Sequence, residues 1–242
     1  MRAELIPKIK ALCARAGLGE PDTGAAPPVP RPPLRRRPQP RVDVVAIGVS
    51  TGGPNALARL LPALPGTLPV PVLIVQHMPP MFTRILAERL DAASALRVVE
   101  AADGDVPEPG GAWIAPGGRH MIVEQVDGRY EIRTNEDPPE HSCRPAVDPL
   151  FRSVVRCYGP HVLAVVLTGM GSDGSDGARD VYEAGGQVLV QDEGSSVVWG
   201  MPGSVARAGY ADAIVPIEEM HGEILARLSI GRGAPAVGGA SR

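Results

Sequence analysis

The sequence predicts an α/β protein of three layers (αβα), in which a doubly wound and mostly parallel sheet carries an antiparallel β-hairpin at its edge. Three observations support this fold class. Apolar, β-branched runs recur along the chain, and most are followed by a stretch with helical spacing. Hydrophobic residues make up 44% of the chain and aromatic residues only 3%, so the core is expected to be aliphatic, which suits a buried parallel sheet. One stretch near the middle breaks the alternation with dense turn signals.

The first two strand–helix pairs open the globular part. Residues 44–49 are an apolar run, and a turn rich in glycine that ends at Pro54 separates them from residues 55–61, whose apolar side chains recur at helical spacing. Residues 70–76 are a second apolar run, and a helix is predicted at 82–90. Each pair therefore predicts a strand, a turn and a helix that covers the sheet.

The middle of the chain, residues 97–134, has a different character because turn signals are dense there. Residues 121–126 and 129–134 flank Asp127-Gly128, a pair typical of a two-residue hairpin turn. This stretch is expected to be antiparallel β-structure added to the parallel sheet. Residues 135–147 are expected to form an exposed loop.

The last part of the globular region returns to strand–helix alternation. Asp148 is expected to cap a helix whose first residue is Pro149. Residues 161–168 are a third apolar strand, and the glycine-rich loop 169–177 leads into a helix that ends near residue 184. Two further strands are predicted at 187–191 and 213–215.

The domain organisation follows from changes in composition. Residues 1–41 are expected to contain a short basic amphipathic helix, at 1–17, and a linker rich in proline and arginine. Residues 42–230 form the predicted globular domain, and residues 231–242 are expected to be a disordered tail. The three consecutive arginines at 35–37 suit a solvated tether better than a contact with an acidic partner or a membrane.

Charge and cysteine content exclude several classes of protein. Residues 1–41 carry nine Lys/Arg and three Asp/Glu, whereas the rest of the chain carries 15 and 24. An acidic globular part argues against a nucleic-acid partner. Three cysteines without a Cys-x-x-Cys pair indicate a reducing compartment and no zinc site. No signal peptide opens the chain and no apolar run is long enough to span a membrane, so we expect a cytoplasmic protein without membrane insertion.

The turn after the first strand carries the first functional signal. Residues 48–52 match the G-x-S-x-G nucleophile elbow, which holds Ser50 at a strand end that faces a helix N-terminus. Taken alone, this stretch leaves other possibilities open. A dinucleotide-binding turn would have glycine in place of Ser50, and a P-loop would need Gly-Lys-Ser/Thr. A plain tight turn with an incidental serine remains equally compatible with these letters.

Three apolar strands end near residues that together could carry out acyl transfer. Ser50 and His77 follow the first two strands, and Asp173 lies in the loop after the third. The carboxyl ends of parallel strands share one edge of a sheet, so these side chains can meet there. Serine would be the nucleophile, imidazole its base, and the carboxylate would orient the imidazole.

Alternatives remain for each of these residues. His77 could be an ordinary loop histidine, and Asp173 could only shape its glycine-rich loop, with Asp176 serving in its place. A thiol nucleophile at Cys143 is a weaker alternative, because a lone cysteine is more often inert. The other histidines are less well placed: His120, His141, His161 and His221.

Six blocks of residues, in order, resemble the CheB-type chemotaxis methylesterases. The resemblance covers 42–230 and rests on these blocks: 50–54 (STGGP), 76–79 (QHMP), 115–120 (APGGRH), 144–148 (RPAVD), 167–174 (LTGMGSDG), and 191–193 (QDE) with 200–202 (GMP). It implies a serine hydrolase that removes methyl groups from glutamate methyl esters of chemotaxis receptors, releases methanol and also deamidates receptor glutamines. The receptors would be its partners, and the chemistry needs no metal or organic cofactor. A catalytically silent receptor-docking module and a small-molecule esterase are the alternatives.

The resemblance also implies roles for individual residues. Ser50 would be the nucleophile, His77 the base and Asp173 the acid that orients it. Backbone N–H groups near Thr51 and Met170 would bind the oxyanion. Two residues of matching blocks are expected to line the substrate cleft: Arg144 and Met201.

The sequence differs from the α/β-hydrolases in one feature and departs from the usual CheB-type pattern in another. The chain order Ser…His…Asp differs from the Ser…Asp/Glu…His order of the α/β-hydrolases. Family members usually carry an N-terminal receiver domain, phosphorylated on aspartate, that gates the active site, and residues 1–41 are too few to hold one. This stretch resembles the family's interdomain linker, so we expect either that a receiver has been removed or that this is a stand-alone version. If a receiver restrains the enzyme, this chain is expected to be constitutively active.

Overall fold

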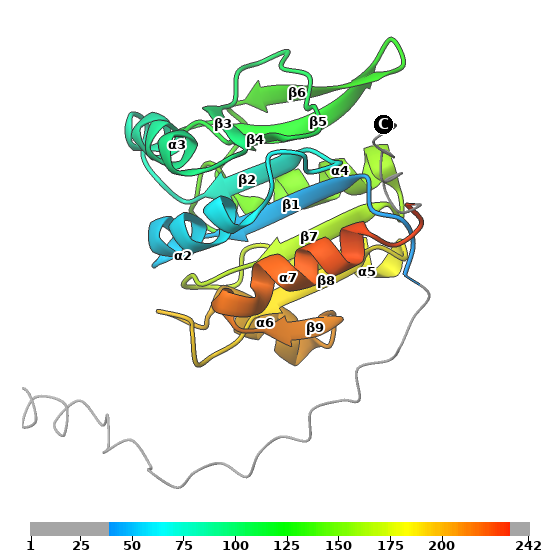
Figure 1. The fold of residues 1–242 in the computed structure, drawn as a ribbon. Helices are drawn as coiled ribbons and strands as arrows, with labels where there is room; N and C mark the ends of the chain where they lie inside the picture. The colour runs from blue at the N-terminus through cyan, green and yellow to red at the C-terminus, as the bar shows by residue number, and fades with distance from the viewer. Residues whose placement is uncertain (1–38, 233–242) are drawn as a thin grey trace, which may run out of the picture. The chain divides into compact units, whose positions relative to one another are not determined.

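The computed structural model of the protein describes residues 39–232 (Figure 1). The helix predicted at 1–17, nearly all of the expected linker and most of the expected tail lie outside the described residues. All described residues belong to one compact unit, Leu34–Arg242. None of the helices between residues 39 and 232 is long and apolar enough to cross a membrane.

Seven parallel strands form the central sheet, in the spatial order β3-β4-β2-β1-β7-β8-β9. The strands are β1 (Val44–Val49), β2 (Val72–Gln76), β3 (Arg97–Glu100), β4 (Gly111–Ile114), β7 (Val162–Val166), β8 (Gln187–Gln191) and β9 (Ala213–Val215). The chain first forms β2, β3 and β4 on one side of β1 and then β7, β8 and β9 on the other side. The order reverses between β1 and β7, so the predicted doubly wound topology is confirmed.

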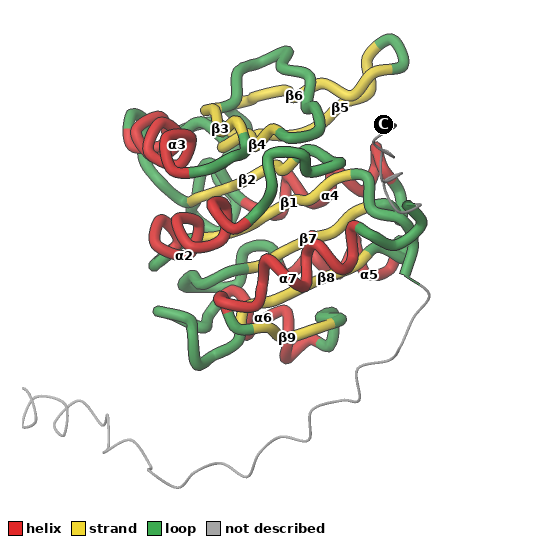
Figure 2. The backbone as a smooth tube through the Cα atoms, viewed as in Figure 1, coloured by secondary structure: helices red, strands yellow, loops and turns green. Residues whose placement is uncertain are grey.

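Helices cover both faces of the sheet and give the predicted three layers (Figure 2). One face carries α2 (Gly53–Leu60), which continues into a 3-10 turn at Leu61–Ala63, with α3 (Phe82–Ala93) and α7 (Ile217–Leu228). The other face carries α4 (Val147–Tyr158), α5 (Ser175–Glu183) and α6 (Met201–Ala208). Strand β1 serves both faces, because Val45 and Ile47 enter one apolar cluster while Val44 and Ala46 enter the other. This two-sided burial explains its uninterrupted apolar sequence.

The predicted hairpin is present, but it does not extend the central sheet. Strands β5 (His120–Val126) and β6 (Arg129–Asn135) form a separate two-stranded antiparallel sheet. Both turn residues, Asp127 and Gly128, have positive φ, as a two-residue hairpin turn of this kind requires. The Val123 N–H donates to Ser153 Oγ on α4 at 3.0 Å, so the hairpin packs on a helix.

The edge of the central sheet also differs from expectation. Strands β3 and β4 lie in the stretch that was expected to be antiparallel, yet both are parallel strands of the central sheet. Each is only four residues long. Strands this short show too little periodicity to reveal their partners, and the segment between them crosses over before β4 inserts between β3 and β2.

Candidate active site

Three neighbouring strands bring the predicted catalytic residues to one edge of the sheet. Ser50 follows β1, His77 follows β2, and Asp173 lies in the loop after β7. Strand β1 pairs with both β2 and β7, so the residue after β1 lies between the other two strand ends (Figure 1). This edge is the place where doubly wound sheets bind ligands.

The turn that carries Ser50 is held on both sides. Its N–H donates to the Thr168 carbonyl at 3.0 Å, and its carbonyl accepts from the Gly53 N–H at 2.8 Å and from Gln76 Nε2 at 3.1 Å. Gly52 precedes α2 with a φ of 83°, a conformation that residues with a Cβ rarely adopt. The elbow predicted from G-x-S-x-G therefore has the expected strand–turn–helix context.

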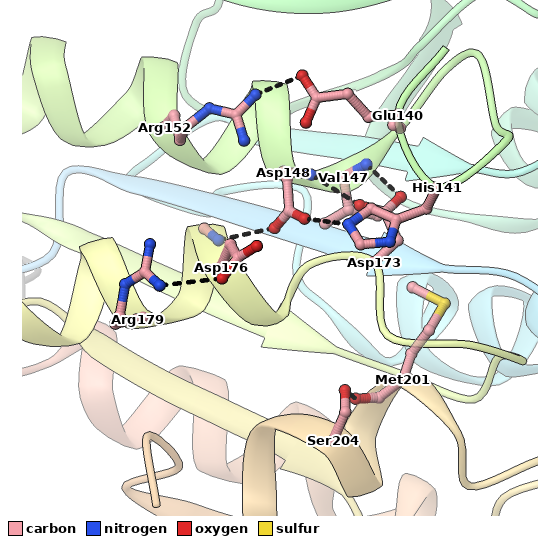
Figure 3. A network of polar contacts seen from close by, with 12 residues as sticks. Glu140, His141, Val147, Asp148, Arg152, Asp173, Asp176, Arg179, Met201 and Ser204 are labelled. Atoms are coloured by element: carbon pink, nitrogen blue, oxygen red, sulfur yellow. Dashed lines mark hydrogen bonds and ion pairs between the residues drawn. The ribbon is translucent and has the colours of Figure 1, made fainter. Parts of the chain in front are cut away.

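His77 and Asp173 form a close pair. His77 Nε2 lies 2.7 Å from Asp173 Oδ2, and the two side chains are 10% and 2% exposed. The Asp173 carboxylate also accepts the N–H groups of Val147 at 2.7 Å and Asp148 at 3.0 Å, which belong to the first turn of α4 (Figure 3). One carboxylate thus caps a helix and holds an imidazole.

These contacts set the charge of Asp173. Burial raises the pKa of this carboxyl, but the hydrogen bonds from His77 and from the Val147 and Asp148 amides outweigh burial and lower the pKa below its ordinary value. Asp173 is therefore ionised at neutral pH and faces His77 through the Nε2 atom of the ring. Nδ1 is the ring nitrogen that does not face Asp173. Within residues 39–232 the Ser50 hydroxyl makes no hydrogen bond to His77.

Asp148 is not the N-cap of α4, contrary to the expectation from sequence. The cap is Ala146, and Asp148 is the second helical residue. Its carboxylate instead accepts the Gly177 N–H at 2.7 Å. It also pairs with His141 Nε2 at 2.8 Å (Figure 3). The Val147 and Asp148 amides, which a local capping side chain would bind, donate to Asp173 instead. Asp173 is distant in sequence, so a rule based on neighbouring residues does not predict it.

Two amides predicted to bind an oxyanion are unengaged. Thr51 and Met170 lie in the turns after β1 and β7, and both residues are exposed. In the part of the chain that the structure describes, neither N–H is bonded to a protein acceptor. The Thr168 hydroxyl donates to the Thr51 carbonyl at 2.9 Å, which joins the two turns.

The two residues expected at the substrate cleft lie in different environments. Arg144 is half-buried, and its Nη1 donates to the carbonyls of Glu136 at 2.8 Å and Asp137 at 3.2 Å. Met201 is fully buried, and a Cβ at Gly169 would overlap its sulfur. Met201 therefore supports the Gly169 turn from beneath rather than lining an open surface.

The structure disfavours the two alternative site residues. Asp176 is exposed and pairs with Arg179 on its own helix at 3.0 Å, while His77 pairs with Asp173. Burial, followed by the charge of Asp173, raises the pKa of the Cys143 thiol, which disfavours the nucleophilic thiolate.

One cluster has the composition of a metal site. Ligand atoms of His141, Asp148 and Asp173 all lie within 4.8 Å of one another. These atoms already take part in hydrogen bonds, with Asp173 serving two amides and His77, and Asp148 serving Gly177 and His141. The donor set therefore suits its present hydrogen-bonding role better than it suits a cation.

No role follows from the sequence for three buried polar residues at strand ends: Gln76, Thr168 and Gln191. Gln191 Oε1 accepts the Thr168 N–H at 2.8 Å, and its Nε2 donates to the Ser195 carbonyl at 2.9 Å. The signal that could have found them is a polar residue directly after a fully apolar strand, at the edge where the site lies.

Comparisons with known proteins identify the family of this chain. The family model described as CheB methylesterase matches residues 45–224. The chain belongs to the CheB methylesterase family. A solved member, the Thermotoga maritima CheB methylesterase catalytic domain, matches with a TM-score of 0.75 and 41% identity, over 76% of this chain and 98% of that one. The predicted α/β fold is thus confirmed by a solved CheB domain.

Curated CheB-family relatives are longer than this chain. A protein-glutamate methylesterase/protein-glutamine glutaminase of Trichodesmium erythraeum is 55% identical over 188 residues, which are 78% of this chain and 53% of that protein. One of the same name from Nocardioides sp. is 49% identical over 233 residues, 95% of this chain and 63% of that protein. The chain therefore spans between half and two thirds of the length of these relatives.

Proposed function

We propose that this CheB-family chain hydrolyses glutamate methyl esters on chemotaxis receptors and deamidates receptor glutamines. The observation that carries the proposal is the His77–Asp173 pair at 2.7 Å, next to the strand end that holds Ser50. The names of the relatives supply the substrate class, because they are protein-glutamate methylesterases and protein-glutamine glutaminases. We propose chemotaxis receptors as the partners. We also propose a cytoplasmic location, because an odd number of cysteines is typical of a reducing compartment.

The proposed reaction has two steps. His77 Nδ1 takes the proton of the Ser50 hydroxyl as Oγ attacks the ester carbonyl carbon, and Asp173 stabilises the imidazolium. The methoxy group leaves with that proton as methanol and an acyl-enzyme remains. Water then attacks the acyl carbon and gives a proton to His77, which passes it to Ser50 Oγ as the bond between Oγ and the acyl carbon breaks. Glutamate leaves and Ser50 is restored. With glutamine as substrate, ammonia leaves instead of methanol.

The remaining proposed roles concern the oxyanion and the substrate. The unengaged N–H groups of Thr51 and Met170 suit the negative oxygen of the tetrahedral intermediates. Met201 would act indirectly, through its packing under Gly169, and Arg144 would act at the cleft beside the 136–137 backbone.

Methanol release from methylated chemoreceptor tests the proposal, with the chain compared to Ser50→Ala. We expect the variant to lose roughly 10³-fold or more in rate while it keeps the fold. Equal release by both proteins would exclude Ser50 as the nucleophile and direct attention to Cys143. No release by either folded protein would favour the docking module, and much faster cleavage of simple esters than of receptor would favour a small-molecule esterase.

A further inference from the structure

We propose that Gln76 is a positioning residue that fixes the separation between Ser50 and His77. The inference rests on the proposed serine-hydrolase function and assigns it a residue that does not touch the substrate. Gln76 is the last residue of β2 and is 2% exposed. It lies directly before His77 and opposite Val49, the residue that precedes Ser50.

The backbone ladder between β1 and β2 stops just before the site. Its last bond runs from the His77 N–H to the Val49 carbonyl, at 3.1 Å. Beyond it Ser50 turns into α2 while the chain after His77 leads towards α3. In the part of the chain that the structure describes, no backbone hydrogen bond joins Ser50 to His77. The two reacting residues thus lie where the strands separate.

The Gln76 side chain supplies a further link at that point. Its Nε2 donates to the Ser50 carbonyl and to the His77 carbonyl, each at 3.1 Å. A single amide group has two N–H donors, so it can bind both carbonyls at once. Ser50 is tied on its other side through its N–H to Thr168, so Gln76 completes the attachment.

The orientation of the Gln76 amide leaves its oxygen without a partner, which indicates that the two bonds made by its nitrogen determine the orientation. Gln76 Oε1 is buried and has no hydrogen-bond partner among the described residues. An unpaired buried acceptor is destabilising. Exchanging the amide oxygen and nitrogen would place the oxygen against two carbonyl oxygens, so the observed orientation is the favourable one. A Cβ at position 53 would overlap Oε1, and Gly53 leaves the space it needs.

Catalysis is sensitive to the distance that Gln76 controls. Proton transfer from Ser50 to His77 requires hydrogen-bond reach between the two side chains. A displacement of about 1 Å in such a site can cost ~10²-fold in rate. Removing the link between the two carbonyls should therefore lower the rate of chemistry and leave receptor binding nearly unchanged.

The chain offers a matched control at the amino-terminal ends of the strands, opposite the site. Gln187 opens β8 and is also 2% exposed. Its Nε2 donates to the Pro40 carbonyl at 2.9 Å, and its Oε1 accepts from Arg227 Nη1 at 2.8 Å. Both glutamines are therefore buried and hydrogen-bonded, but only Gln76 is next to the site.

The experiment compares Gln76→Leu and Gln76→Glu with Gln187→Leu and Gln187→Glu. The Leu variants remove the donors, and the Glu variants keep the shape but place oxygen where the donor was. Two readouts are measured on folded protein: kcat and KM for methanol release, and the rate at which a fluorophosphonate labels the active-site serine. We expect both Gln76 variants to lose at least about tenfold in kcat and in labelling rate, with KM within about twofold. The Gln187 variants should lower Tm and leave both rates within about twofold.

Several outcomes would overturn the inference. These are unchanged rates in folded Gln76 variants, equal losses in the Gln187 variants, or Gln76 variants that all fail to fold while the Gln187 variants fold. Failure of the proposed function looks different, because it appears in the unsubstituted chain. That chain would be labelled but release no methanol if only the substrate class is wrong, and would do neither if it is no serine hydrolase.

Discussion

Under the proposed function, Asp173 would serve stability and chemistry together. Its carboxylate accepts two amides of α4 and the imidazole of His77. The helix needs an acceptor at its N-terminus, and the imidazole needs a fixed partner. Because the same carboxylate meets both needs, the position of the His77 ring is tied to the position of α4. Its neighbour Asp148 is equally buried but serves a loop histidine and a glycine amide.

The pKa of Asp173 predicts how Asp173→Asn changes stability with pH. Its folded pKa lies below the ordinary value of 3.8, so the carboxylate stabilises the fold above that pH and ceases to do so as pH falls through the folded pKa. The decrease in the free energy of unfolding caused by Asp173→Asn should therefore be largest near neutral pH and smaller in acid. Urea unfolding across this range measures the difference.

Asp148→Asn is the control with the opposite sign. Burial and the charge of Asp173 raise the folded pKa of Asp148, although the Gly177 bond and His141 partly offset them. The original Asp148 therefore disfavours folding increasingly as pH rises, and the Asn variant should gain relative stability in that direction. Equal pH slopes for the two variants would contradict the assigned causes.

The elements divide into those that local sequence predicts and those that it does not. The bounds of β8 and β9 match the predicted strands at 187–191 and 213–215, because both are apolar runs between clear turn signals. The hairpin turn at Asp127-Gly128 was equally local. The pairing of β3 and β4, and the packing of the hairpin on α4, depend on contacts between distant residues. The Val147 and Asp148 amides that bind Asp173 are also distant from it in sequence, so no local pattern revealed them.

Gly48 tests the contact between β1 and α4. A Cβ there would overlap the γ carbons of Val147, the first residue of α4. Gly48→Ala should therefore displace the start of the helix, lower the free energy of unfolding by about 1–3 kcal/mol, and reduce kcat because the Val147 amide holds Asp173. Chemical denaturation and the methanol assay measure the two effects.

Gly222→Ala is the matched control for that substitution. Gly222 is an exposed interior residue of α7, and nothing lies within 4 Å of the position its Cβ would take. Alanine there should raise the free energy of unfolding by about 0.5–1 kcal/mol and leave kcat unchanged. Equal effects of the two substitutions would mean that the contact at Gly48 does not control α4.

At the scale of the whole molecule, both ends of the described chain form hydrogen bonds near the amino-terminal ends of the central strands, opposite the site. The Pro40 carbonyl accepts from Gln187, and the Arg41 carbonyl is bonded to His161 at 2.8 Å. Arg232 Nη2 donates to the Val42 carbonyl at 2.6 Å. The domain boundaries predicted at 42 and 230 would cut through this group of contacts.

Truncation can locate the boundaries. A chain of residues 39–232 should keep the Tm and kcat of the full chain, because it retains all of these end contacts. A chain of residues 44–230 should have a lower Tm and a similar kcat, because it loses them while the site edge is intact. Thermal unfolding and the methanol assay distinguish the two, and an equal Tm for both chains would show that the end contacts contribute nothing.

The contact between Arg232 and Val42 also separates the order of residues along the chain from their arrangement in space. A short link between these two ends, with a new opening at the Asp127-Gly128 turn, would give a circular permutant in which every strand keeps its neighbours. In that polypeptide the order of the three site residues would be Asp173, Ser50, His77. Neighbouring strand ends, and not the sequence order Ser…His…Asp, place these three residues at the same ends of adjacent strands.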